Sequence, residues 1–217
     1  MPTSVSWSGR ALCAALVCGF LLGTSTAAPI VAPVGSSFDD GLDGWTSNKP
    51  AEVSWAATGG NPGGYVRFED ATVGNTYLYA PEKFLGDWRP YNDVGILLYD
   101  FQLLHLGSYL DIRDYSVSIS GPGGTAQWTS PGPEGLNPWE CIVILMTEST
   151  WQVTSGSWTG ALADVQELSI MIELVAGLGS AREDISGIDN VALVPEPASL
   201  ILLSLMGLAL ARHRRAV

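Results

Sequence analysis

Cysteine, histidine and positive charge are scarce in this sequence. Three cysteines and two histidines occur among 217 residues, and between residues 29 and 193 only Cys141 and His105 remain. A lone cysteine excludes an internal disulfide framework, and so few histidines and cysteines exclude the usual zinc sites. Because Cys141 stands in the apolar run CIVILM, we expect a small core residue and not a reactive thiol.

Charge is low and strongly acidic. Charged residues make up 15 % of the chain, and its formal net charge is −12. Between residues 28 and 194, six lysines and arginines stand against 21 aspartates and glutamates. Such a body repels phosphate backbones, which argues against nucleic acid as a partner, and it suits hard cations such as Ca²⁺. The alternative is that the charge only keeps the protein soluble.

Signatures of catalysis are also missing. The chain has no Gly-x-Ser-x-Gly elbow, no HExxH and no Cys/His metal spacing. His105 lies in the apolar run LLHLG and is expected to be structural, and the many acids have no distinguishing context. We therefore predict a non-enzymatic protein with no catalytic residue. The alternative is a secreted polysaccharide hydrolase or esterase on the same scaffold.

The first 28 residues are typical of a secretory signal peptide. Arg10 precedes the apolar run 11–23, and small residues follow at 24–28, which predicts cleavage after Ala27 or Ala28. A short transmembrane anchor is the alternative. Residues 29–35 are rich in proline and valine and are expected to be a linker.

The C-terminal segment 194–217 combines three features in order. Pro195-Glu196-Pro197 comes first, an apolar run of 14 residues follows at 198–211, and the basic residues Arg212, Arg214 and Arg215 come last. A full membrane span needs about 20 residues, so the run is short for one. Basic residues stay on the cytoplasmic side of the membrane, so the three arginines would stop transfer of the chain and leave the body outside.

This segment resembles a PEP-CTERM sorting signal. The resemblance implies recognition by an exosortase and cleavage near Pro195, Glu196 and Pro197, after a transient stay in the inner membrane. It also implies delivery to the cell surface or the extracellular space, in association with exopolysaccharide. An ordinary C-terminal anchor with a chance Pro-Glu-Pro is the alternative.

Short segments with alternating apolar residues recur between residues 36 and 193, separated by turn clusters such as GGNPGG at 59–64 and GPGG at 121–124. We predict an all-β jelly-roll β-sandwich of two antiparallel sheets, flanked by a signal-peptide helix and a C-terminal hydrophobic helix. A short helix is expected within 161–167. The expected strands are 36–38, 45–46, 52–57, 65–69, 76–80, 94–104, 115–120, 125–129, 140–146, 167–175 and 187–193.

The body resembles a known extracellular module. FDDGLDGW at 38–45 is similar to the start of galactose-binding-like jelly rolls, and YLYAPEKFLGDWRPY at 77–91 followed by GILLYDFQL at 95–103 resembles the laminin B module, laminin domain IV. The closing GIDNVALV fits the same pattern. The resemblance implies one domain over 36–193 with a structural or carbohydrate-binding role. The cysteine-rich repeats that flank laminin modules are absent from this sequence.

Two kinds of binding residue are predicted. Asp39, Asp40 and Asp43 stand near the first strand and Asp189 in the last, and first and last strands are often neighbours in jelly rolls. Asp39, Asp40 and Asp189 are predicted to hold a structural Ca²⁺, as in related carbohydrate-binding modules; the alternative is that Asp39–Asp43 only caps a turn.

Tryptophans near turns are the second kind. Pyranose rings stack on flat aromatic faces, and Trp88, Trp139 and Trp158 are expected to be exposed for that purpose. The alternative is that these rings belong to the core, as most tryptophans in a sandwich do.

Overall fold

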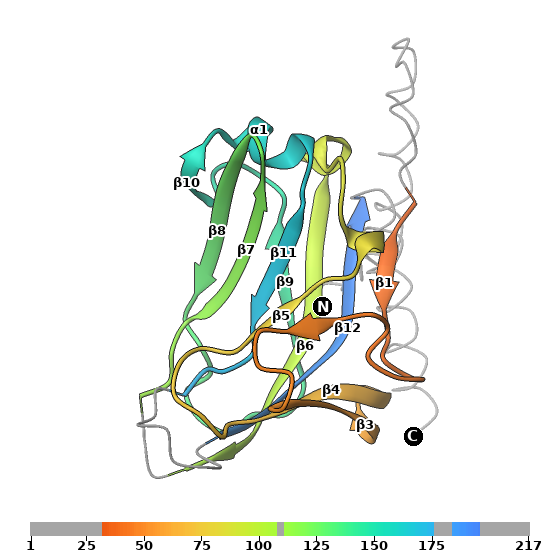
Figure 1. Ribbon diagram of the computed structural model, residues 1–217, viewed down its shortest axis with the longest axis vertical. Helices are drawn as coiled ribbons and strands as arrows, with labels where there is room; N and C mark the ends of the chain where they lie inside the picture. The colour runs from red at the N-terminus through yellow and green to blue at the C-terminus, as the bar shows by residue number, and fades with distance from the viewer. Residues whose placement is uncertain (1–31, 108–110, 176–183, 196–217) are drawn as a thin grey trace, which may run out of the picture. The chain divides into compact units, whose positions relative to one another are not determined.

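Two antiparallel sheets account for the strands of the computed structural model, which describes residues 32–107, 111–175 and 184–195. Sheet A has the order β3-β4-β12-β6-β9, and β1 also pairs with β12. Its strands are β1 (Val34–Ser36), β3 (Val53–Gly60), β4 (Gly63–Glu69), β6 (Gly95–Leu106), β9 (Glu140–Leu145) and β12 (Asp184–Pro195). The two sheets form separate layers (Figure 1).

Sheet B has the order β10-β8-β7-β11-β5-β2. Its strands are β2 (Thr46–Ser47), β5 (Tyr77–Tyr79), β7 (Tyr115–Gly121), β8 (Gly124–Ser130), β10 (Gln152–Gly156) and β11 (Glu167–Met171). The predicted all-β sandwich of two antiparallel sheets is therefore confirmed. Strand β10 was not predicted, because its sequence QVTSG carries little apolar character.

Helical structure is limited to short pieces in the described residues. Helix α1 (Trp158–Ala163) starts earlier than expected, because the hydroxyl oxygen of Ser157 accepts a hydrogen bond from the Gly160 amide at 3.0 Å and caps it. Two 3-10 turns, η1 (Glu82–Phe84) and η2 (Arg89–Tyr91), form the corner between β5 and β6.

No helix within the described ranges is long and apolar enough to cross a membrane. The expected terminal helices, Glu196, Pro197 and the three terminal arginines lie outside those ranges.

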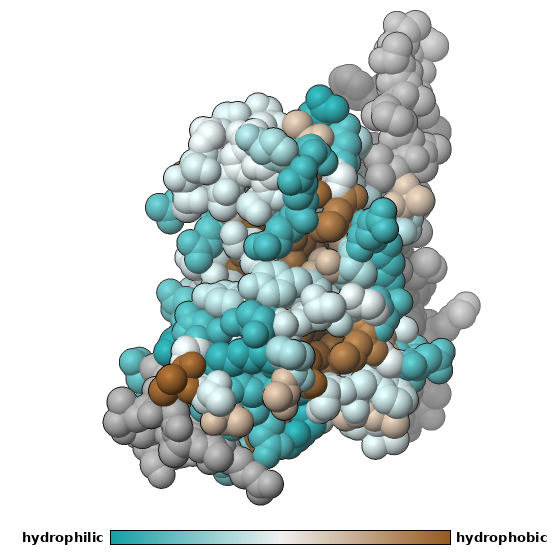
Figure 2. All heavy atoms as spheres, viewed as in Figure 1, coloured by the Kyte–Doolittle hydropathy of each residue, from teal (hydrophilic) through white to brown (hydrophobic). Residues whose placement is uncertain are grey.

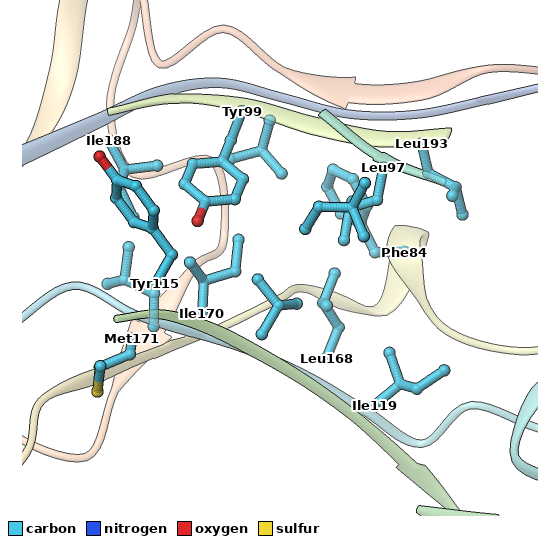
Figure 3. Packing of buried hydrophobic residues seen from close by; sticks show 14 of the residues in the cluster. Phe84, Leu97, Tyr99, Tyr115, Ile119, Leu168, Ile170, Met171, Ile188 and Leu193 are labelled. Atoms are coloured by element: carbon cyan, nitrogen blue, oxygen red, sulfur yellow. The ribbon is translucent and has the colours of Figure 1, made fainter. Parts of the chain in front are cut away.

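The core lies between the sheets and is built by alternation along each strand. In β6, Leu97, Tyr99 and Phe101 point inward and are fully buried, and in β7 Val117 and Ile119 do the same from the other sheet. Figure 3 shows such side chains meeting from the two layers. Phe84 of η1 is buried among them, as expected for an apolar corner.

Polar side chains cover most of the face shown in Figure 2, and Cys141 is one of the exposed residues of the protein. On the face shown in Figure 2, hydrophilic residues predominate and hydrophobic ones form small separate patches. Cys141 is exposed, so the expectation of a core residue is wrong. The reason is the register of β9, an edge strand in which Ile144 points inward while Cys141, Val143 and Leu145 point outward.

Candidate functional site

The outer face of sheet B carries a continuous row of polar side chains. Across neighbouring strands Tyr79 lies opposite Ser169, Ser169 opposite Ser118, and Ser118 opposite Gln127. Gln152 of β10 continues the row. Residues directly opposite each other in an antiparallel pair lie on the same face, so these side chains stand side by side.

Strict alternation in the sequence creates this face. In β7 the apolar Val117 and Ile119 are buried, which turns Ser116 and Ser118 to the other side of the sheet. In β5 the buried Leu78 likewise separates the two half-buried tyrosines. The inner face of the sheet is thus apolar, and the outer face carries hydroxyl groups.

A shallow hollow of about 310 Å³ lies over this row. Its lining combines aromatic, hydroxyl and amide side chains with a single carboxylate, and it contains neither lysine nor arginine: Tyr77, Tyr79, Ser116, Ser118, Gln127, Thr154, Glu167 and Ser169. An open, hydroxyl-rich surface flanked by aromatic rings, with one carboxylate and no cationic side chain, suits the flat faces and edge hydroxyls of a sugar.

Tyr77 is held in a defined position, and Tyr79 beside it is half-buried. The backbone amide of Tyr77 donates to Asn48 Oδ1 at 2.8 Å, and the side-chain amide of Asn75 donates to the Tyr77 hydroxyl at 3.0 Å. Burial, with the nearby Glu167 and Tyr77, raises the pKa of Tyr79 above its ordinary value. The Tyr79 hydroxyl therefore stays protonated at neutral pH and can donate a hydrogen bond to a ligand.

One amide in the hollow is also oriented. Gln127 Nε2 donates to the hydroxyl oxygen of Ser116 at 2.9 Å. That contact leaves the second amide hydrogen and the carbonyl oxygen of Gln127 available to a ligand. The hydroxyl hydrogen of Ser116 is available as well, because its oxygen acts as the acceptor in this bond.

Two of the three predicted ligand-binding tryptophans are buried. Trp88 and Trp158 are each 2 % exposed. The indole of Trp88 donates to the Phe84 carbonyl at 2.7 Å, and that of Trp158 donates to Asn92 Oδ1 at 2.6 Å. The expectation that these rings are exposed is therefore wrong, because η2 and α1 turn them into the core.

Trp139 lies apart from sheet B. Its half-buried ring packs edge-on against Tyr65 at a centroid distance of 5.4 Å, and its indole donates to the Gly59 carbonyl at 2.9 Å. Both rings lie close over Gly187 of β12, where a Cβ atom would meet them within 2.9 Å. Trp139 therefore stands on the outer face of sheet A, where the ligand contact predicted for it would belong to a different site from the hollow on sheet B.

The predicted calcium ligands are brought together only in part. Asp189 of β12 is buried, and its oxygens accept from the backbone amides of Asn61 at 2.6 Å and Asn190 at 2.8 Å. Burial, followed by Asp100 and Asp39, raises its pKa, so Asp39 lies close enough to act on it. Asp40 is exposed in the same loop as Asp39.

Amide donors already occupy much of this acid site. Asp100 lies opposite Asp189 in the sheet, and its Oδ2 accepts from the side-chain amides of Asn61 at 3.1 Å and Asn190 at 2.9 Å. The calcium site at Asp39, Asp40 and Asp189 stays a prediction.

A second group of acids lies elsewhere in the fold and consists of Glu52, Asp70 and Glu173. Among the described residues it is the one group of three acids in which one carboxylate oxygen from each lies within 4.8 Å of the other two. The sequence does not predict this group, because nothing in the spacing of its residues joins them.

No family model matches the chain, and no curated protein matches its sequence. Solved structures similar to it include the following three. The L4b domain of human laminin alpha-2 has a TM-score of 0.41 and 16 % identity, over 56 % of this chain and 71 % of that one. A family 11 carbohydrate-binding module from Clostridium thermocellum, solved with a β-1,3-1,4-mixed-linked tetrasaccharide, has a TM-score of 0.47 and 16 % identity, over 76 % of this chain and 96 % of that one. A family 30 carbohydrate-binding module of a cellulosomal cellulase from the same organism has a TM-score of 0.43 and 12 % identity, over 78 % of this chain and 96 % of that one.

Proposed function

We propose that this chain is an exported, non-catalytic protein that binds a glycan on the outer face of sheet B. The observation that carries the proposal is the row from Tyr79 through Ser169 and Ser118 to Gln127, which combines an aromatic ring with hydroxyl and amide groups in one shallow hollow. A single carboxylate, Glu167, lines that hollow, whereas hydrolysis of a glycosidic bond ordinarily uses a pair.

The chemistry of the hollow favours a neutral glycan. Its lining offers hydrogen-bond donors and acceptors but no lysine or arginine to pair with an anionic sugar. The net charge of −12 would also repel acidic polysaccharides. An exopolysaccharide with uncharged repeating units therefore fits this face better than an anionic one.

Sorting of the protein is the second part of the proposal. The order of Pro195-Glu196-Pro197, the apolar run and Arg212, Arg214 and Arg215 supports handling by an exosortase at the inner membrane. Cleavage near the prolines would release the body, residues 36–193 with the preceding linker 29–35, to the cell surface or the extracellular space.

Affinity electrophoresis of the full chain tests the binding proposal. Gels contain mixed-linkage β-glucan, xylan or, as the anionic comparison, alginate. We expect retardation by at least one neutral polysaccharide and none by alginate, and Tyr79→Ala should weaken retardation about tenfold, which corresponds to about 1.4 kcal/mol of aromatic contact. Equal mobility of the wild type in every gel would refute the proposal.

A further inference from the structure

Acidic side chains from both sheets meet at one end of the sandwich. Glu52 precedes β3, Asp70 follows β4, and Glu173 follows β11. One oxygen from each lies within 4.8 Å of the other two, and the three residues are 5 %, 2 % and 3 % exposed. Carboxylates are seldom buried together unless a counter-charge or a proton compensates them.

The spacing of these oxygens fits a calcium ion. Ca²⁺ binds oxygen ligands at about 2.3–2.6 Å, so two ligands on opposite sides of the ion lie about 4.6–5.2 Å apart. The three oxygens lie within 4.8 Å of one another, so one Ca²⁺ ion can contact all of them. Mg²⁺ requires near-ideal octahedral geometry and usually keeps several of its waters, so a buried group of carboxylates suits Ca²⁺ better.

A fourth acid, Asp184, is the second and independent observation. It is fully buried at the start of β12, and neither carboxylate oxygen has a hydrogen-bond partner of good geometry among the described residues. Its side chain shares the inner face of the strand with Ser186, whose hydroxyl donates to the Ile172 carbonyl at 2.6 Å. The side chain of Asp184 is thus directed toward the end of β11, where Glu173 lies.

The backbone places Asp184 beside the other acids. The amide of Asp70 donates to the Asp184 carbonyl at 3.1 Å, so the two acids lie on neighbouring strand ends. A buried carboxylate in such surroundings needs a proton or a cation to compensate its charge.

The protein's own groups compensate the cluster incompletely. Lys49 Nζ lies 3.4 Å from Glu52 and 3.6 Å from Glu173, so one ammonium group faces two of the carboxylates. The Thr72 hydroxyl donates to the other oxygen of Glu52 at 2.6 Å. The hydroxyl of Thr76 lies 2.8 Å from a Glu52 oxygen and 3.1 Å from a Glu173 oxygen. A hydroxyl has one hydrogen and cannot donate fully to both acceptors.

The cluster is accessible from solvent. A hollow of about 280 Å³ opens beside it, and Glu52 and Asp70 contribute to its wall together with Ser54. A cation can therefore reach the buried oxygens without separation of the sheets, and water in the hollow can complete its coordination.

We propose that Glu52, Asp70, Glu173 and Asp184 bind a structural Ca²⁺ ion between the two sheets. The ion joins the ends of β4 and β12 in sheet A to the end of β11 in sheet B, in a chain whose body has no disulfide. This site is separate from the predicted one at Asp39, Asp40 and Asp189.

Calorimetry and thermal unfolding test the proposal on the full chain purified in chelator. CaCl₂ is titrated into the wild type, Glu173→Gln, Asp184→Asn and Asp39→Asn, the last being a variant of the other acid group, and into Glu148→Gln, an exposed acid outside both groups, as the control. We expect Ca²⁺ to raise the unfolding temperature of the wild type and of Glu148→Gln. The two cluster variants should bind at least about tenfold more weakly and lose most of that rise.

The amide variants also separate a metal site from a purely structural ion pair. Asp184→Asn removes a buried charge, so in chelator its unfolding temperature should equal or exceed that of the wild type, which shows that the variant folds. The proposal is overturned if the wild type takes up no Ca²⁺. It is also overturned if Asp39→Asn, and not Asp184→Asn, abolishes the response.

Discussion

Tyr79 of β5 and Ser169 of β11 lie directly opposite each other in sheet B, and both side chains point away from the core. Cross-strand partners of this kind have Cβ atoms about 4.5–5.5 Å apart. One sugar ring stacked on Tyr79 would therefore bring its hydroxyls within reach of the serine. This pairing places an apolar contact and a hydrogen-bonding group on the same ligand.

Substitution of Gln127 tests whether its side-chain amide contributes to ligand binding on this face. Gln127→Ala should weaken binding of a neutral oligosaccharide about 3- to 10-fold, because it removes a positioned donor and acceptor worth about 0.5–1.5 kcal/mol. Titration calorimetry measures the change. The matched control is Gln166→Ala, an exposed glutamine outside the hollow, which should bind like the wild type. Equal loss in both variants would show that the effect does not come from the hollow.

Cys141 should react slowly although it is exposed. Burial of its sulfur, followed by Asp100, raises the pKa of the thiol to about 11, so at pH 8 little thiolate is present. We expect alkylation by iodoacetamide at pH 8 about tenfold slower than in the urea-unfolded chain, since the higher nucleophilicity of a high-pKa thiolate offsets part of the effect. Mass spectrometry of the Cys141 peptide gives the rates.

A second variant shows whether the negative charge of Asp100, and not only steric shielding, slows the alkylation of Cys141. Asp100→Asn should speed the reaction and lower the pH at which the rate levels off, because it removes a negative charge beside the sulfur. If the folded and unfolded chains react alike at pH 8, the assigned environment of Cys141 is wrong.

The sequence predicted the sheets well because alternation is a local property. Leu78 between two tyrosines, and Val117 and Ile119 between serines, specify which side of each strand is buried. The same alternation turns Tyr77 and Tyr79 outward, but ligand-binding rings were predicted only among tryptophans near turns.

Placement of side chains by short helices and distant strands could not be predicted from the sequence. Trp88 and Trp158 are buried because η2 and α1 pack against the sheets, and no local pattern reveals that packing. Glu52 and Glu173 are 121 residues apart in the sequence and meet only in the fold. Residues far apart in a chain leave no spacing signal, so this acid group was missed.

Gly63 is expected to be sensitive to substitution. Its φ angle is +93°, which L-residues rarely adopt, and a methyl group there would overlap Asp39 Oδ1. Gly63→Ala should lower the free energy of unfolding by about 1–3 kcal/mol, measured by denaturant unfolding. Gly135→Ala, where a Cβ atom meets nothing within 4 Å, is the control and should change it by about 0.5 kcal/mol or less. Equal stability of the two variants would contradict the geometry of this turn.

The sorting proposal predicts the ends of the native protein. Mass spectrometry of protein isolated from its producing cells should show an N-terminus near residue 28 or 29 and a C-terminus near Pro195–Pro197. Replacement of Glu196 by Ala should leave the C-terminal arginines on the protein and keep it in the membrane fraction. Secreted wild-type protein that still carries Arg212, Arg214 and Arg215 would contradict exosortase handling.

Chemical-shift mapping tests the glycan face most directly. Backbone amide spectra of the isotope-labelled full chain are recorded with and without a neutral oligosaccharide taken from the polysaccharide that retards the protein most. We expect the largest shifts in β5, β7, β8 and β11, around Tyr79, Ser169 and Gln127, and small ones around Trp139 on the outer face of sheet A. Shifts centred on Trp139, with sheet B unchanged, would contradict the account.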